Sequence, residues 1–166
     1  MSKFKSFDQV PQQAREFGFF VGGNWYAPEG RNLLSRKAPG YGLEVSRITL
    51  CNTQDVNKAV AAARSTFNKG HWASISGADR GKVLTLTAQG IRDRIEELAF
   101  WETLETGKPI SQSRSEIADA ATHYEYCAGL AQTLHGETFN NYGDSLFGMV
   151  IREPIGVVGL ITPWNF

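Results

Sequence analysis

The sequence has few cysteines, no long apolar run and no excess of either charge. Its two cysteines, Cys51 and Cys127, lack the spacing of a disulfide framework and are typical of a reducing compartment. No apolar stretch approaches the roughly 20 residues that span a bilayer. Residues 1–20 carry charges throughout and lack the apolar segment of a signal peptide. We therefore expect a cytoplasmic protein with no membrane partner.

The charge balance argues against a further class of proteins. The 17 basic and 17 acidic residues cancel, and no segment concentrates either sign. Because affinity for nucleic acid comes mainly from basic side chains that neutralise phosphates, we expect no nucleic-acid partner. The three histidines, His71, His123 and His135, show no metal-site spacing. With 166 residues, 42% of them hydrophobic, the chain is long enough for about one domain with a core.

Short strands are expected in the first part of the chain. Residues 1–17 are polar and irregular, and we expect an arm that lies on the surface or on a partner subunit. Residues 19–26 predict a strand, a glycine turn and a second strand. Residues 32–35 and 43–50 predict two more strands, separated by proline and glycine turn signals.

Three helices are expected next. The first begins at the cap formed by Asn52 and Thr53 and ends at Gly70. The second runs from about residue 78 to residue 105, and the third spans roughly 111–134. Apolar residues recur in each at the helical interval, which predicts amphipathic helices.

Both cysteines are interpreted as small core residues rather than nucleophiles. Cys51 precedes the cap of the first helix, and Cys127 falls on the expected buried stripe of the third. Tyr124 falls on the same stripe, and we favour a core position for it over one that faces a substrate channel.

The pattern changes after the helices. Residues 138–141 and 145–152 flank the turn 142–144 and predict a compact hairpin, whose apolar second arm invites pairing with another chain. Residues 155–161 form an apolar run of the kind found in strands buried on both faces. Pro163 ends this run because proline cannot donate to a sheet ladder.

Trp164 and Asn165 follow this expected strand on the loop at its carboxyl end, where open α/β sheets bind ligands. Gly156 and Gly159 lack the spacing of a G-x-G-x-x-G fingerprint, and close strand packing explains them better. The chain stops just after Asn165, one residue beyond the loop that follows an expected central strand, so we expect the sequence to be cut rather than complete.

Several stretches resemble the aldehyde dehydrogenase superfamily. The most specific is Arg-Glu-Pro-Ile-Gly-Val-Val-Gly-Leu-Ile-Thr-Pro-Trp-Asn-Phe at 152–166, and the others lie at 21–25, 55–63, 105–109 and 124–129. The resemblance implies an α/β fold of which this chain is the N-terminal part. Residues 1–135 would supply the helical layer of a Rossmann-type dinucleotide-binding domain. Residues 136–154 would form an oligomerisation hairpin, and 155–166 the first core strand and the cofactor-site loop.

The resemblance also implies a reaction. An aldehyde is oxidised to a carboxylic acid with NAD or NADP, through a thioester on a cysteine. Ile161, Thr162, Pro163 and Trp164 would line the nicotinamide side of the cofactor pocket together with Asn165. The side-chain amide of Asn165 would hold the oxyanion, because a neutral donor stabilises negative charge without titrating. The family's nucleophilic cysteine and base belong to motifs absent from these residues, so we expect the chain alone to be inactive.

Partners and alternatives follow from the same resemblance. The substrate is a small-molecule aldehyde, and the hairpin at 136–154 joins subunits of a dimer or tetramer by strand addition. A non-catalytic assembly module and an acylating relative that uses CoA or phosphate remain alternatives.

A carboxylate at Glu105 matches a position that binds a monovalent cation in some family members. The adjacent positive charges of Arg36 and Lys37 argue against a cation, and we expect no metal. Glu102, Glu105 and Lys108 are interpreted as paired charges at a solvated helix end rather than as an acid-base group.

Overall fold

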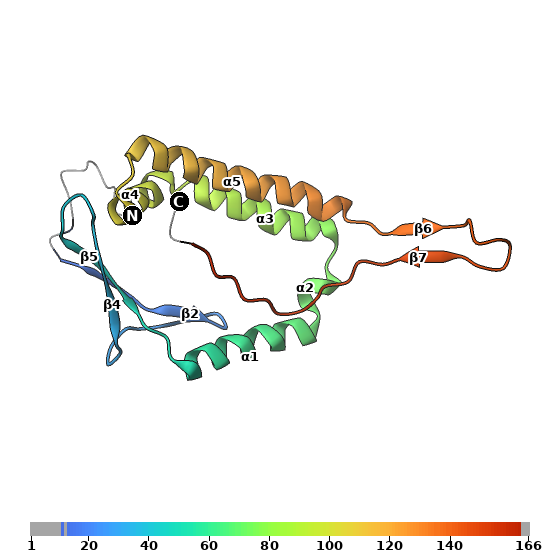
Figure 1. The fold of residues 1–166 in the computed structure, drawn as a ribbon, viewed down its shortest axis with the longest axis horizontal. Helices are drawn as coiled ribbons and strands as arrows, with labels where there is room; N and C mark the ends of the chain where they lie inside the picture. The colour runs from blue at the N-terminus through green and yellow to red at the C-terminus, as the bar shows by residue number, and fades with distance from the viewer. Residues whose placement is uncertain (1–10, 12, 164–166) are drawn as a thin grey trace.

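Two long helices lie side by side along the computed structural model and organise the rest of the chain (Figure 1). They are α3 (Gly77–Arg92) and α5 (Ile110–Thr133). The structure describes residues 11 and 13–163. Within this part of the chain, no helix combines the length and the apolar character that crossing a bilayer requires.

Glycine allows the close approach of α3 to α5. A Cβ added to Gly77 would lie 2.3 Å from the carbonyl oxygen of Ala131, and one added to Gly81 would lie 2.8 Å from that of Ala128. Real Cβ atoms do not approach backbone oxygens so closely, so each glycine admits the backbone of the facing helix. Ala88 on α3 is fully buried in the same region.

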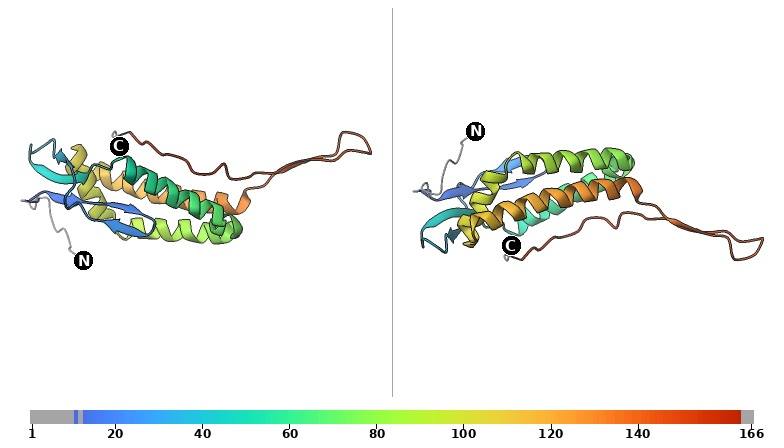
Figure 2. Two further views of the ribbon diagram at one scale, coloured as in Figure 1. Left: turned by 90° about the horizontal axis from the view of Figure 1, so that it is seen from below. Right: turned by 90° about the horizontal axis from the view of Figure 1, so that it is seen from above.

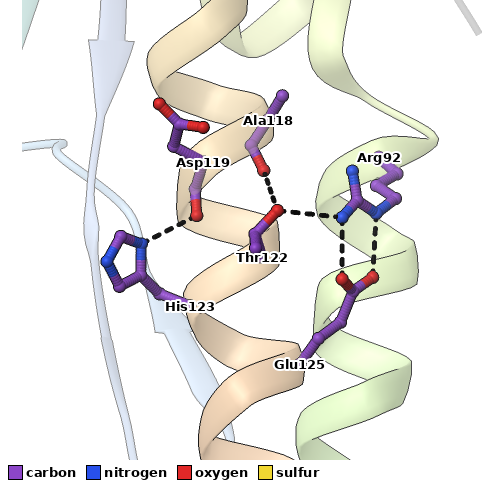
Figure 3. Close-up of polar contacts among 6 residues, drawn as sticks. All are labelled: Arg92, Ala118, Asp119, Thr122, His123 and Glu125. Carbon is purple, nitrogen blue, oxygen red and sulfur yellow. Dashed lines mark hydrogen bonds and ion pairs between the residues drawn. The ribbon is translucent and has the colours of Figure 1, made fainter.

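Polar side chains bridge the same two helices near one end (Figure 3). Arg92 of α3 donates two hydrogen bonds, of 2.9 and 2.8 Å, to the carboxylate of Glu125 on α5. It also donates to the hydroxyl of Thr122, which itself donates to a backbone carbonyl of α5. The pair orients the two helices but is exposed, so it contributes little net stability.

The second predicted helix is two helices. α3 ends at Arg92 and α4 (Ile95–Thr106) begins after a turn at Asp93 and Arg94. Arg94 has a non-helical backbone, with φ −121° and ψ 17°. No proline or glycine marks this break, so helical periodicity alone did not reveal it. The turn directs α4 towards the sheet, where its apolar residues are buried.

The expected strands at 32–35 and 43–50 are confirmed as β4 (Leu33–Lys37) and β5 (Glu44–Thr49). They pair antiparallel. A small core joins this sheet to α4, and Trp101 packs against it. Its buried residues are Ala38, Val45, Phe100 and Leu104.

The prediction of an irregular arm up to residue 17 is wrong at its end, because β1 (Arg15–Phe17) pairs parallel with β5. A three-residue strand has no periodicity to detect, and distant residues hold it. Arg47 of β5 forms an ion pair with Glu16 at 3.2 Å and a second with Glu44 at 2.6 Å. The hydrogen bonds from Arg47 lower the pKa of Glu44 to about 2.

The predicted hairpin at 19–26 is confirmed as β2 (Phe19–Val21) and β3 (Asn24–Tyr26). Gly22 and Gly23 form its turn with φ of +60° and +84°, which side chains disfavour.

The first predicted helix is confirmed as α1 (Thr53–Lys69). Asn52 and Asp55 form a reciprocal capping box, and Gly70 ends the helix with φ +69°. The hydrogen bond from Arg31 lowers the pKa of Asp55. A further helical turn, α2 (His71–Ser74), follows directly and was not expected. The third predicted helix is confirmed as α5.

The last described residues project from this body and then return to it (Figure 2). β6 (Glu137–Phe139) and β7 (Gly148–Val150) form the predicted antiparallel hairpin, but their connection runs from 140 to 147 and is not a compact turn at 142–144. Residues 151–163 then pass back alongside the helices without regular secondary structure.

We predict that Gly81→Ala destabilises the protein by about 1–3 kcal/mol, because its methyl group would overlap the Ala128 carbonyl oxygen. Gly90→Ala on the same helix is the matched control, since a Cβ there meets no atom within 4 Å. That change should instead stabilise α3 by about 0.5–1 kcal/mol. Urea unfolding of both variants measures the difference, and equal shifts would contradict the close approach.

Candidate functional site

The segment 151–163 contains the described part of the predicted site. Ile161 is fully exposed, and Thr162 and Pro163 are exposed beside it. Trp164 and Asn165, the other two predicted site residues, lie outside the described residues. The structure therefore brings Ile161, Thr162 and Pro163 together as consecutive residues of one accessible chain segment.

The expected strand at 155–161 is absent from the described structure. Residues 155–161 have no ladder partner, and the side chains of Ile155 and Leu160 are 93% and 86% exposed. The prediction of a strand buried on both faces is wrong for these 166 residues. The physical reason is that a strand needs neighbours to pair its backbone groups, and the sequence of one segment does not supply them.

One contact ties this segment to a helix. A Cβ added to Gly156 would lie 3.4 Å from a terminal guanidinium nitrogen of Arg64 on α1. Gly156 and Val157 are half-buried, whereas the other residues of 151–163 are exposed. The sequence gives no signal for this contact, because Arg64 has the spacing of an ordinary surface residue on an amphipathic helix.

The carboxylate expected at a family cation position is engaged within the protein. The buried hydroxyl of Ser46 donates a hydrogen bond of 2.5 Å to Glu105 on α4. Within the described ranges, no group of three or more histidine, cysteine, aspartate or glutamate side chains is arranged to hold a metal ion. Glu105 therefore joins β5 to α4, which gives it a structural role here.

Lys108 lies between two carboxylates at the corner between α4 and α5. Its ammonium is 2.7 Å from Glu102 and 2.5 Å from Glu116, and its side chain is only 12% exposed. Burial lowers the pKa of Lys108, but the hydrogen bonds of the two carboxylates outweigh burial and raise it. The hydrogen bond from Lys108 lowers the pKa of Glu116. The charges are paired as expected, but this helix end is largely shielded from solvent.

Both cysteines are exposed, so their assignment to the core is wrong in this structure. On α5, the buried positions that face α3 include Ala121 and Ala128, and Cys127 lies one residue from that face. Tyr124 is 41% exposed and is not a core residue either. Helical periodicity predicted which face of α5 is buried, but it did not predict which residues at the margin of that face are exposed.

His123 is exposed on α5, where its ring nitrogen Nδ1 lies 2.8 Å from the carbonyl oxygen of Asp119, one turn earlier (Figure 3). This is a local contact within the helix, and it gives His123 no chemical role.

An open groove of about 710 Å³ lies between β1 and α4. Its walls include Phe17, Trp25 and Trp101, and the guanidinium of Arg15 lies over the ring of Phe17 at 5.0 Å. Residues 161–163 do not line it. The groove is thus separate from residues 161–163, the described part of the predicted site, and the guanidinium of Arg15 lies at its wall.

Comparison with known proteins identifies the relatives of this chain. The family model described as the aldehyde dehydrogenase family matches residues 25–166. The chain is 40% identical over 147 residues to betaine aldehyde dehydrogenase of Bacillus subtilis, covering 89% of the chain and 30% of that protein. It is 38% identical over 169 residues to aminoaldehyde dehydrogenase 2 of Zea mays, covering 94% and 32%.

Solved structures agree with this result. A crystal structure of an NAD-dependent aldehyde dehydrogenase from Sinorhizobium meliloti matches 96% of the chain and 32% of its own length, with a TM-score of 0.88 and 41% identity. A betaine aldehyde dehydrogenase variant from Staphylococcus aureus in complex with NAD+ matches 95% of the chain and 32% of its own length, with a TM-score of 0.84 and 29% identity. The chain spans 30–32% of the length of these relatives.

We predict that Lys108→Met lowers the melting temperature at neutral pH and returns the pKa of Glu116 towards 4.5. Because folding lowers the pKa of Glu116, its stabilising effect is present above the ordinary value and is lost as the pH falls through the lowered one. The difference in melting temperature between wild type and variant should therefore shrink in acid.

Lys82→Met is the matched control for this measurement. Lys82 also forms an ion pair, with Asp79, but its side chain is 75% exposed, so its loss should change the melting temperature little. A Lys108→Met difference that stays constant as the pH falls would contradict the account.

Proposed function

Because the chain belongs to the aldehyde dehydrogenase family, we propose that the protein containing it oxidises an aldehyde to a carboxylic acid with NAD or NADP. The observation that carries this proposal is the family match over residues 25–166, with 41% identity to a solved NAD-dependent enzyme. The exposed 155–163 segment supports it, because an extended, accessible apolar segment is suited to border a binding site.

We assign the nicotinamide side of the cofactor pocket to Ile161, Thr162, Pro163, Trp164 and Asn165. The three described residues of this set have side chains suited to a nicotinamide ring. Ile161 offers a fully exposed apolar side chain for a flat ring, Thr162 adds a hydroxyl, and Pro163 restricts the backbone. When bound, the nicotinamide cofactor supplies the acceptor for the hydride of the substrate.

The amide of Asn165 is assigned to the oxyanion. When a cysteine thiolate attacks the aldehyde carbon, the carbonyl oxygen gains the negative charge, and an amide N–H donor stabilises it without changing its own protonation state. Hydride loss then gives a thioester, which water cleaves to the acid. Neither Cys51 nor Cys127 belongs to the family's nucleophile motif, so we propose that residues 1–166 alone are inactive.

The substrate proposed is an aldehyde that carries a positively charged nitrogen. The support is the names of the relatives in Bacillus subtilis and Zea mays, which specify betaine aldehyde and aminoaldehyde. Both cysteines are free thiols rather than a disulfide, which supports a reducing, cytoplasmic location.

We propose that the hairpin at 136–154 joins subunits. Among the described residues its strands pair only with each other, over three residue pairs, and an isolated two-stranded hairpin is marginally stable in water. Met149 and Val150 of β7 are 60% and 45% exposed. Adding this edge to the sheet of a second copy would pair its backbone and cover these side chains, which gives a homodimer or homotetramer.

For the site, we predict that Asn165→Ala in the full-length enzyme lowers kcat about 100-fold, because an oxyanion donor is lost. The KM for the aldehyde should change little. The assay follows reduction of NAD and of NADP with betaine aldehyde and an aminoaldehyde, and Asn140→Ala in the exposed hairpin loop is the control. Unchanged kcat would contradict the assignment. Turnover that requires added CoA or phosphate would instead favour an acylating relative. Absence of any turnover by the wild-type enzyme would favour a non-catalytic assembly module.

For assembly, we predict that the double change Met149→Lys and Val150→Lys in β7 shifts the full-length protein to smaller oligomers, because buried charge opposes strand addition. Light scattering coupled to size exclusion measures the mass. Asn140→Lys and Tyr142→Lys add the same charge within the connecting loop, outside the paired strands, and serve as control. An unchanged mass in the first variant would rule out the hairpin as the subunit contact.

A further inference from the structure

The contact between Arg64 and Gly156 is the one place where the described 151–163 segment is partly shielded. Gly156 and Val157 are half-buried, and all their neighbours in the segment are exposed. Two nitrogens of the Arg64 guanidinium lie 3.4 and 3.8 Å from the position that a Cβ of Gly156 would occupy. The views in Figures 1 and 2 agree that the segment passes beside α1.

The backbone of Gly156 is specific to glycine. Its φ is +128°, a conformation that side chains rarely adopt, so any other residue would be strained there. Gly159, three residues later, has no positive φ, and a Cβ there would meet nothing within 4 Å. The two glycines of this segment therefore differ, and only the one beside Arg64 needs to be glycine.

Arg64 is held on its other side by its own helix. Its guanidinium lies 5.6 Å from the ring centroid of Phe67, one turn along α1, at the distance of a cation–π contact. Within the described part of the chain, no carboxylate lies within ion-pair distance of Arg64. The guanidinium thus lies over the ring of Phe67 and beside the position of Gly156.

We propose that Arg64 and Gly156 are positioning residues, which fix where the segment crosses α1 and thereby place Ile161, Thr162 and Pro163 in the cofactor site. This inference rests on the proposed function. From Gly156 to Ile161 the chain spans five residues, or at most ~17 Å when extended. A short extended segment passes a displacement at one end on to the other, so a change at Gly156 is felt at the nicotinamide side of the pocket.

The test uses the full-length enzyme and two readouts. Arg64→Ala, Gly156→Ala and the double variant are compared with Ser65→Ala and Gly159→Ala, which change the same helix and the same segment without this contact. The first readout is kcat and the KM for the dinucleotide and for the aldehyde. The second is the hydrogen-exchange rate of the backbone amides of residues 155–163, measured by mass spectrometry.

We expect Arg64→Ala and Gly156→Ala each to raise the KM for the dinucleotide about tenfold and to speed exchange in residues 155–163. The KM for the aldehyde should stay close to wild type in both variants, and the melting temperature should stay close to wild type in Arg64→Ala, which separates positioning from general destabilisation. The double variant should be no worse than the poorer single variant, because both act through one contact. Arg64→Lys should not restore the KM, since an ammonium lacks the flat face of a guanidinium.

Rates and KM values equal to those of the Ser65 and Gly159 controls would overturn the proposal, as would additive effects in the double variant. An inactive wild-type enzyme would overturn the proposed function instead. In that case, the exchange rates alone still decide whether Arg64 and Gly156 hold the segment.

Discussion

The close approach of α3 and α5 is the constraint on which the remaining architecture depends. Gly77 and Gly81 let the carbonyl groups of Ala131 and Ala128 fill the space that side chains would otherwise take. Because the two helices are fixed along their length, both ends of α5 are fixed as well. One end carries the shielded Lys108 corner next to α4, and the other leads directly into the hairpin and the returning segment.

The returning segment contrasts with this rigid pair. Its backbone groups from residue 151 to residue 163 have no ladder partners among the described residues, and its apolar side chains other than Val157 are exposed. Apolar surface of this kind gains free energy when it is covered, and unpaired backbone gains it by joining a sheet. We propose that residues 155–163 form a functional segment whose position is set at Arg64.

Local signals in the sequence predicted the elements whose causes are local. The cap at Asn52, the glycine turn at residues 22 and 23 and the end of α1 at Gly70 each depend on residues close in sequence, and all are confirmed. Features with distant causes were missed. β1 depends on an ion pair between Glu16 and Arg47, which are 31 residues apart in the sequence. The break before α4 depends on the packing of that helix against the sheet.

The candidate site shows the same division. The run of residues around Ile161 predicted a buried strand ending at Pro163, whereas the structure shows an exposed, irregular segment there. The contact between Arg64 and Gly156 joins residues 92 positions apart, since 156 minus 64 is 92, and nothing in either local pattern indicates it. The prediction that Cys127 lies in the core was wrong for a geometric reason. A step of one residue rotates a side chain about 100° around a helix, which takes Cys127 out of the buried face.

The most direct test of the account is a crystal structure of the full-length protein with bound NAD or NADP. We predict that the Asn165 amide points to the space beside the nicotinamide where a carbonyl oxygen would become charged. An Asn165 side chain turned away into solvent would contradict this assignment.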